Sequence, residues 1–282
     1  MSLIDDLVRG SIDMHLHTGP DPHIARSVDA IQAAAQAAEA GMRAIVLKSH
    51  DYPTAPLASM ISKIVPAVAV LGSLTLDTAN GGLNPSAVEV CARLGGRVIW
   101  MPTFSAAHDM RKRGLPGEGI TIVDGGGDVL PVIKDILAIV KQHRMVIATG
   151  HVSHGEAVAL TRAAREAGIT RIVATHPLET RFGATLGIAG QVEMADRGAF
   201  IEHCFNCVMP LSDRLDPARI VEVVRAVGAE RCILTTDLGQ EWNPPPAEGM
   251  RMMVATLLKC GLSPDEIATM IKTNPSRLLG LD

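Results

Sequence analysis

Two histidines, His15 and His17, stand one residue apart at the end of an apolar run. In a β-strand, residues i and i+2 lie on the same face, so the two imidazoles would point the same way if this run is a strand. Neutral imidazole nitrogen is a good ligand for zinc, and also for iron or nickel. Taken alone, such a pair is more often part of a polar rim without a metal, so the remaining histidines must decide.

Histidines follow several later apolar runs as well. The chain has 10 histidines, and six of them come at or just after the end of such a run: His15, His17, His50, His151, His176 and His203. If the runs are the strands of a parallel barrel, their carboxyl ends share the face on which active sites lie. Random placement would put about one histidine there, because these ends make up roughly a tenth of the chain. The excess favours a metal centre built from several strand ends.

A carboxylate completes this set. Asp237 follows the last apolar run, which would lie beside the first run when a barrel closes. One carboxylate oxygen can bind a metal while the other accepts a proton from water, whose pKa a bound metal can lower to about 7. The sequence therefore predicts a divalent metal centre, with Asp237 as its catalytic base. The expected ligands are His15, His17, His151, His176 and Asp237.

The elements that must position these residues alternate along the chain. Strands are expected at residues 10–17, 43–48, 67–75, 97–101, 145–149, 171–175, 199–202 and 231–235. Helices are expected at residues 28–40, 54–65, 85–94, 131–143, 155–167, 186–197, 217–227 and 247–259. Eight such units predict an α/β fold of the (β/α)₈, or TIM, barrel type, with strands buried on both faces. An open doubly wound sheet is the alternative that periodicity leaves open.

Residues 1–282 are expected to form one barrel domain with two departures from the alternation. Residues 102–130 are too long for an idle loop, and we expect an insertion after the fourth strand that covers the substrate and includes a small hairpin. Residues 263–282 begin with the helix-start signal Ser-Pro-Asp-Glu and should form a helical tail.

Composition narrows the class of protein and its partners. Lys+Arg total 26 and Asp+Glu total 30, a net charge of −4, which argues against nucleic acid as a partner. No apolar run approaches the ~20 residues of a membrane helix. The 5 cysteines are an odd number, and no secretory signal is apparent. We expect a cytoplasmic protein that acts on a small molecule, without a membrane partner, and we leave homo-oligomerisation open.

With these residues in place, the chain resembles the amidohydrolase superfamily of metal-dependent hydrolases, most closely its amidohydrolase-like branch. The resemblance extends from His15 and His17 to the tail NPSRLLGL at residues 274–281, which is similar to the closing helix of that family. It implies that the five ligands predicted above hold one or two divalent metals, zinc first and manganese or iron as alternatives. It also implies hydrolysis of an amide, a lactone or ester, or a phosphoester.

One departure from the family concerns the fourth strand. Binuclear members commonly carry a bridging carboxylated lysine, or a glutamate, at its end, whereas this strand ends with Trp100 and Met101. Lys48 ends the second strand instead. If carboxylated, Lys48 could bridge two metals, and if cationic it could bind a substrate carboxylate or phosphate. His50, two residues later, is a further candidate ligand.

Two alternatives stay open. Lys48-Ser49-His50 is also similar to the polymerase-and-histidinol-phosphatase (PHP) type of phosphoesterase, which would use a three-metal cluster with His50 as a ligand. Against it, Gly239 stands where that group has a histidine, and Asp77 after the third strand is its only acidic candidate there. The other alternative is a barrel that binds a ligand without catalysis.

Four residues are candidate substrate contacts. Arg26 lies in the loop after the first strand, and His203 follows the seventh strand together with Glu202. His108 and Arg111 belong to a basic cluster within residues 102–130. These cations suggest that the small substrate is anionic.

Overall fold

The computed structural model describes residues 2–282. Eight parallel strands form one sheet in the order β1 to β8. Their bounds are β1 Ile12–His17, β2 Ala44–Lys48, β3 Ala69–Thr75, β4 Gly96–Trp100, β5 Val146–Ala148, β6 Ile172–Ala174, β7 Phe200–Cys204 and β8 Cys232–Thr235. Every strand expected from the sequence is present, with shifts of a few residues at its ends.

Backbone hydrogen bonds join the two edges of this sheet. The backbone N–H of Asp237 donates to the carbonyl oxygen of His15 at 2.7 Å, and that of His17 donates to the carbonyl oxygen of Leu238 at 2.8 Å. The sheet therefore closes just beyond the end of β8, and the prediction of a (β/α)₈ barrel is confirmed. An open doubly wound sheet is excluded, because its first and last strands would not meet.

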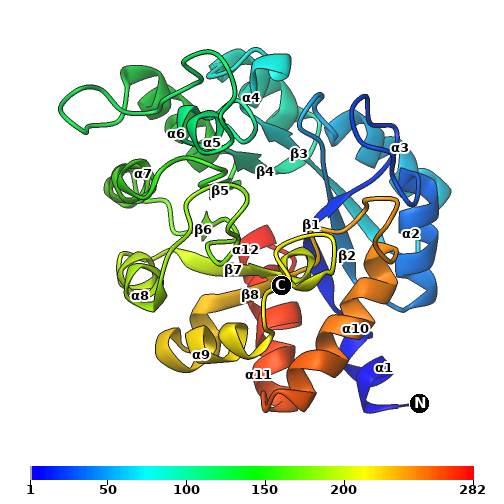
Figure 1. Ribbon diagram of the computed structural model, residues 1–282. Helices are drawn as coiled ribbons and strands as arrows, with labels where there is room; N and C mark the ends of the chain where they lie inside the picture. Colours follow the sequence, from blue (N-terminus) through cyan, green and yellow to red (C-terminus); the bar gives the residue numbers. More distant parts are fainter. Residues whose placement is uncertain (1) are drawn as a thin grey trace.

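Helices surround the ring of strands (Figure 1). The eight that follow strands along the chain are α2 Ala30–Glu39, α3 Ala55–Ile64, α4 Pro85–Arg93, α6 Pro131–Gln142, α7 His154–Glu166, α8 Ile188–Asp196, α9 Ala218–Val227 and α10 Pro246–Lys259. Single 3₁₀ turns cover Thr78–Asn80, Phe205–Val208 and Ala229–Arg231. The sequence also forms α1, Leu3–Val8, which the sequence analysis did not predict; a capping box between Ser2 and Asp5 begins it.

Residues 102–130 and 263–282, the two segments that depart from the strand–helix alternation, have defined structures. Within residues 102–130 a short helix, α5 (Ala107–Lys112), was not predicted, and the expected hairpin is a single antiparallel bridge between Val123 and Val129. The tail contains α11 (Pro264–Ala268), a π-helical turn (Thr269–Thr273) and α12 (Asn274–Leu279). Ser263 caps α11 as its sequence signal predicted.

The core is aliphatic and has two parts. Inside the barrel, Val46, Val98 and Val146 pack around Trp100, and Leu278 of α12 belongs to the same cluster. Outward-facing residues of the same strands pack against the helices in a second, larger cluster. The tail helix α12 thus contributes to the barrel interior. No helix within residues 2–282 has the length and apolar character needed to cross a membrane.

Candidate metal centre

An irregularity in β1 brings the two histidines of this strand into the barrel interior. Ile12 and Met14 pack inside the barrel, so strict alternation would turn His15 outward. The pairing of β1 with β2 shifts register between Asp13 and Leu16. A bulge of this kind re-aims the side chains that follow it. His15 consequently lies against the interior Trp100, with ring centroids 5.6 Å apart, and His17 lies on the same side.

Asp237 and the two histidines of β1 converge on one point. Oδ1 of Asp237 lies 3.0 Å from Nε2 of His15 and 3.0 Å from Nε2 of His17. A second group of metal-ligating atoms, from His176, Glu179 and Asp237, lies within 4.8 Å of one another. Asp237 belongs to both groups. The arrangement therefore offers two adjacent positions for a divalent cation, with Asp237 between them.

The other predicted ligands lie beside these groups. The rings of His151 and His176 are 5.0 Å apart, and those of His17 and His50 are also 5.0 Å apart. Lys48 ends β2 inside the barrel, with Nζ 2.9 Å from Nε2 of His15 and 5.2 Å from the centre of the Trp100 ring. The structure thus brings together all seven of the metal ligands that the sequence suggested.

Backbone strain accompanies two of these residues. Asp237 and His176 have positive φ angles of 51° and 27°, a conformation that is rare for residues other than glycine and that occurs often at functional sites. Gly239, two residues after Asp237, has a φ of +137°, and a Cβ atom there would lie 2.0 Å from the carbonyl oxygen of His17. The close approach of the β8 loop to β1 therefore requires glycine, so this backbone cannot carry the histidine of a PHP-type site at position 239.

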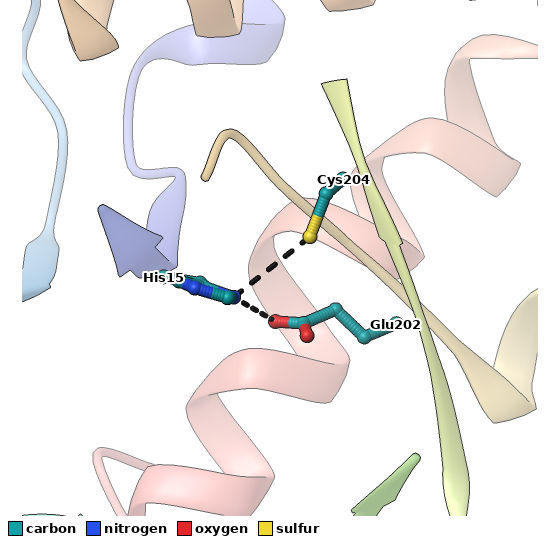
Figure 2. Close-up of side chains that lie close together, drawn as sticks. All are labelled: His15, Glu202 and Cys204. Carbon is teal, nitrogen blue, oxygen red and sulfur yellow. Dashed lines mark hydrogen bonds and ion pairs between the residues drawn. The ribbon is translucent and has the colours of Figure 1, made fainter. Parts of the chain in front are cut away.

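In three of the histidines, a carboxylate or a hydroxyl group lies beside Nδ1, the ring nitrogen that points away from the candidate metal position. Nδ1 of His15 donates to Oε1 of Glu202, and the two atoms are 3.2 Å apart; the pair is drawn in Figure 2. Nδ1 of His151 lies 3.3 Å from Asp109, and Nδ1 of His50 lies 2.7 Å from the hydroxyl of Thr103, which itself donates to Asp77. Such partners fix the tautomer of a metal-binding histidine and leave Nε2 as the ligand.

The protonation states suit metal binding. Burial alone would raise the pKa of Asp237, but the charges and hydrogen bonds of His15 and His17 outweigh it and hold the pKa well below its usual value. Burial lowers the pKa of His17 and of His176 well below the usual value. For His15, burial is outweighed by Asp237 and Glu202, which raise its pKa to about 9. A metal would therefore find Asp237 ionised and the imidazoles of His17 and His176 neutral, and it would have to displace a proton from His15.

The donor set fits a divalent metal. It consists of imidazole nitrogens and carboxylate oxygens, the ligands of zinc, iron and manganese sites. Within residues 2–282, Nδ1 of His176 is buried and lacks an aligned hydrogen-bond partner, although it lies 3.2 Å from Glu179. Buried polar atoms normally have partners. A metal ion held by His176 and Glu179 would supply the missing partner.

The candidate ligands open into a cavity of 190 Å³. Its walls combine aromatic rings from Phe104, Phe182 and Trp242 with the cations Arg26 and Arg181. Both Nε and Nη2 of Arg26 donate to Asp21, and Asn206, Ser212 and Gln240 supply neutral polar groups. The volume lies below the usual range for ligand pockets, so the cavity suits a small substrate.

Comparison with known proteins places the chain in a sequence family. The family of unknown function DUF6282 matches residues 10–202. The chain belongs to that family. The match covers six of the seven predicted ligands and Glu202, and it ends before Asp237. No protein of curated function matches the chain.

Solved structures share the fold over nearly the whole chain. An amidohydrolase from Pseudomonas aeruginosa superposes with a TM-score of 0.67 at 14% identity, covering 98% of this chain and 97% of that one. The probable dipeptidase PvdM from the same organism gives 0.68 at 14% identity, with 98% and 96% covered. A lactonase from Listeria monocytogenes gives 0.63 at 13% identity, with 96% and 94% covered. The resemblance to amidohydrolases is thus confirmed as a likeness of fold.

Three predicted substrate contacts do not reach the cavity. His203 is buried on the outer side of β7, because side chains alternate along a strand and its neighbours Glu202 and Cys204 face His15. His108 contacts the carbonyl oxygen of Gly183 at 3.1 Å, and Arg111 is exposed on α5. Neither lines the cavity. Of the four residues suggested from the sequence, only Arg26 lines it.

The sequence analysis missed several residues around the site. Asp109, which lies beside His151, belongs to α5. Glu179 comes three residues after His176. Phe104 stacks on His50 with ring centroids 3.9 Å apart. A carboxylate three residues after a strand-end histidine was a usable signal for Glu179. Nothing in the sequence connects Asp109 with His151, because the segment that carries Asp109 was expected to include a small hairpin and not the helix α5.

His203 provides a prediction about acid stability. Burial lowers its pKa from 6.5 to about 4, so the unfolded chain binds a proton more tightly than the folded chain. His203 therefore leaves the free energy of unfolding unchanged above about pH 6.5 and lowers it as the pH falls from 6.5 toward 4. At about pH 5 this contribution has lowered the free energy of unfolding by about 2 kcal/mol. His203→Leu should lose that much less free energy of unfolding between about pH 8 and about pH 5 in urea titrations. Equal losses in variant and wild type would refute the lowered pKa.

Proposed function

We propose that this protein is a metal-dependent hydrolase that cleaves an amide, a lactone or ester, or a phosphoester bond of a small anionic substrate. The observation that carries the proposal is the position of Asp237 Oδ1, 3.0 Å from Nε2 of both His15 and His17. Its place at the carboxyl ends of barrel strands supports the proposal, since this is where barrel enzymes act. The related folds, which include an amidohydrolase, a probable dipeptidase and a lactonase, are consistent with it.

We assign the metal to residues of both donor groups. His15, His17 and Asp237 would hold one ion, and His176, Glu179 and Asp237 a second, with His151 and His50 beside them. Zinc is the expected metal, with manganese or iron as alternatives. When bound, the metal supplies Lewis-acid polarisation of the scissile group and lowers the pKa of water. Lys48 would serve as a further metal ligand if it were carboxylated, and would bind the substrate anion if it remained cationic.

Asp237 performs the proton transfers in this proposal. Its low pKa keeps it ionised at neutral pH, so it can accept the proton of the attacking water and return it to the leaving group. Arg26 holds the anionic part of the substrate at the cavity wall, and its ion pair with Asp21 fixes the guanidinium. The rings of Phe104, Phe182 and Trp242 pack against the apolar part of the substrate and limit the entry of water.

Metal analysis of the purified protein tests the proposal. Inductively coupled plasma mass spectrometry should find about two equivalents of metal in the wild type and at most about one in His15→Ala/His17→Ala, which removes two of the three ligands of the first ion. His203→Leu is the matched control, because it removes a buried histidine outside the cavity and should keep the metal. About one equivalent would indicate a mononuclear site with Lys48 free for substrate. About three equivalents, dependent on His50, would favour the PHP-type phosphoesterase.

A metal-free protein would contradict the proposal. If the wild type bound no more zinc, manganese or iron than the double variant, even after each metal is supplied, the histidine cluster would be a ligand-binding rim. If metal is bound, a panel of amides, lactones, esters and phosphoesters identifies the bond that is cleaved.

A further inference from the structure

Arginines gather at the end of the barrel opposite the metal centre. Arg144, Arg171 and Arg231 each come one or two residues before a strand, respectively β5, β6 and β8, and Arg197 ends the helix before β7. Because the strands are parallel, these positions share the amino-terminal end of the sheet. Active sites of barrel enzymes lie at the other end. The proposed hydrolase chemistry therefore does not explain this cluster.

These arginines line two adjoining cavities. The larger has a volume of 520 Å³ and is lined by Arg165, Arg171, Arg197, Arg231 and Arg277, above Phe200 and Leu278. The smaller, of 280 Å³, is lined by Lys141, Arg144 and Arg171. Thr170 and Arg171 belong to both. We call the two together the basic groove. The larger cavity alone falls within the usual size range of ligand pockets and exceeds the 190 Å³ of the catalytic cavity.

The charge of the basic groove is mostly uncompensated. Its lining carries seven cationic side chains against two acidic residues, Asp196 and Asp282. Arg197 pairs with Glu193 at 2.9 Å. Arg165, Arg231 and Arg277 have no carboxylate within ion-pair distance among residues 2–282. Arg231 lies over the Phe200 ring, 5.7 Å from its centre. This concentration of positive charge occurs on a chain whose net charge is −4.

Like charges crowd one another at the centre of the groove. Burial and the neighbouring charges of Arg144 and Arg97 lower the pKa of Arg171, and the charge of Asp282 opposes them only in part. Its Nη1 donates to the backbone carbonyl oxygen of Arg144, not to an acid. A bound anion would relieve this repulsion.

We propose that the basic groove binds a small ligand that carries two or more phosphate groups. Guanidinium groups match phosphate oxygens in bidentate pairs, and several of them converging on a concave surface can hold a chain of phosphates. The two adjoining cavities, joined at Arg171, give room for more than one phosphate group. An acidic chain whose arginines gather in one concave groove favours a small polyanion over a nucleic acid, which requires an extended basic surface.

Titration calorimetry with inorganic triphosphate and with ATP tests this site. We expect both to bind the wild type, and binding to weaken by about tenfold for each of Arg165→Ala and Arg231→Ala. Both side chains are exposed and make no hydrogen bond to the rest of the described chain, so the variants should fold. Arg162→Ala is the matched control, because Arg162 lies on the same helix as Arg165 and pairs with Asp128 outside the groove. It should keep wild-type affinity.

Further measurements separate the sources of binding. Affinity should fall with added salt, and it should persist in His15→Ala/His17→Ala, which excludes chelation at the metal centre. Equal affinity for triphosphate and ATP would show that the phosphates alone are recognised, and tighter binding of ATP would show that a nucleotide is the ligand. The proposal fails if neither compound binds, if the groove variants bind as tightly as Arg162→Ala, or if only a single-stranded oligonucleotide binds.

Discussion

Asp237→Asn is expected to lower kcat/KM by about a thousandfold, for whichever substrate of the screened panel the wild type hydrolyses. The amide has no basic oxygen at neutral pH, so it cannot accept the proton of the attacking water. The wild-type carboxylate is well suited to this role, because His15 and His17 hold its pKa well below the usual value although it is buried. Asparagine has nearly the same shape, so the fold should be retained.

Steady-state kinetics at saturating metal checks this prediction. Saturation matters because Asp237 is also an expected ligand, and a weaker metal site would otherwise mimic the loss of a base. Asp135→Asn is the control: Asp135 is exposed on α6, far in sequence from every site residue. If Asp237→Asn retained a tenth or more of the activity with metal bound, the base would have to be another group, and Asp237 would be a ligand only.

The strands were predictable because their sequence signal is local. Each is a short apolar run between a turn and a helix-length segment, and such runs are fully buried in a parallel barrel. The closure between β1 and β8 followed from the count of units. The short helices α1 and α5 were missed, since six residues carry little periodicity. Ala106, before α5, provides no side-chain cap to mark where that helix begins.

The histidines of the site were predictable for the same reason: each one ends a strand, so the topology alone brings them to one face. The groups that orient them were not. Asp77 follows β3 but acts on His50 of the β2 loop through Thr103 of a third loop. Glu202 and His203 were expected as a pair, yet alternation along β7 places only Glu202 inside the barrel. The β1 bulge is invisible in the sequence, although it decides that His15 faces inward.

Glu202→Gln is expected to weaken metal binding by about 10- to 100-fold. Glu202 is buried, and its Oε1 accepts from Nδ1 of His15 at 3.2 Å and from the hydroxyl of Thr235 at 3.1 Å. With one proton held on Nδ1 by Glu202, Nε2 of His15 is the nitrogen that can give up its proton and bind the metal. A glutamine can present its NH₂ group to Nδ1, which would move the proton to Nε2 and block the ligand. The dissociation constant for zinc, measured by competition with a chromogenic chelator, reports this change.

Two comparisons decide how Glu202 acts. Glu156→Gln is the matched control, because Glu156 is another buried, hydrogen-bonded glutamate, which caps α7 and does not line the cavity. It should bind zinc as the wild type does.

Cys204 lies 3.8 Å from Nδ1 of His15 and could join Glu202 in a separate metal site. Burial raises the pKa of this thiol well above its usual value, and the thiolate is the form that binds metal. Cys204→Ala should therefore leave the metal content unchanged. A loss of one equivalent in Cys204→Ala would make Glu202 a ligand, whereas unchanged affinity in Glu202→Gln would leave it a structural residue.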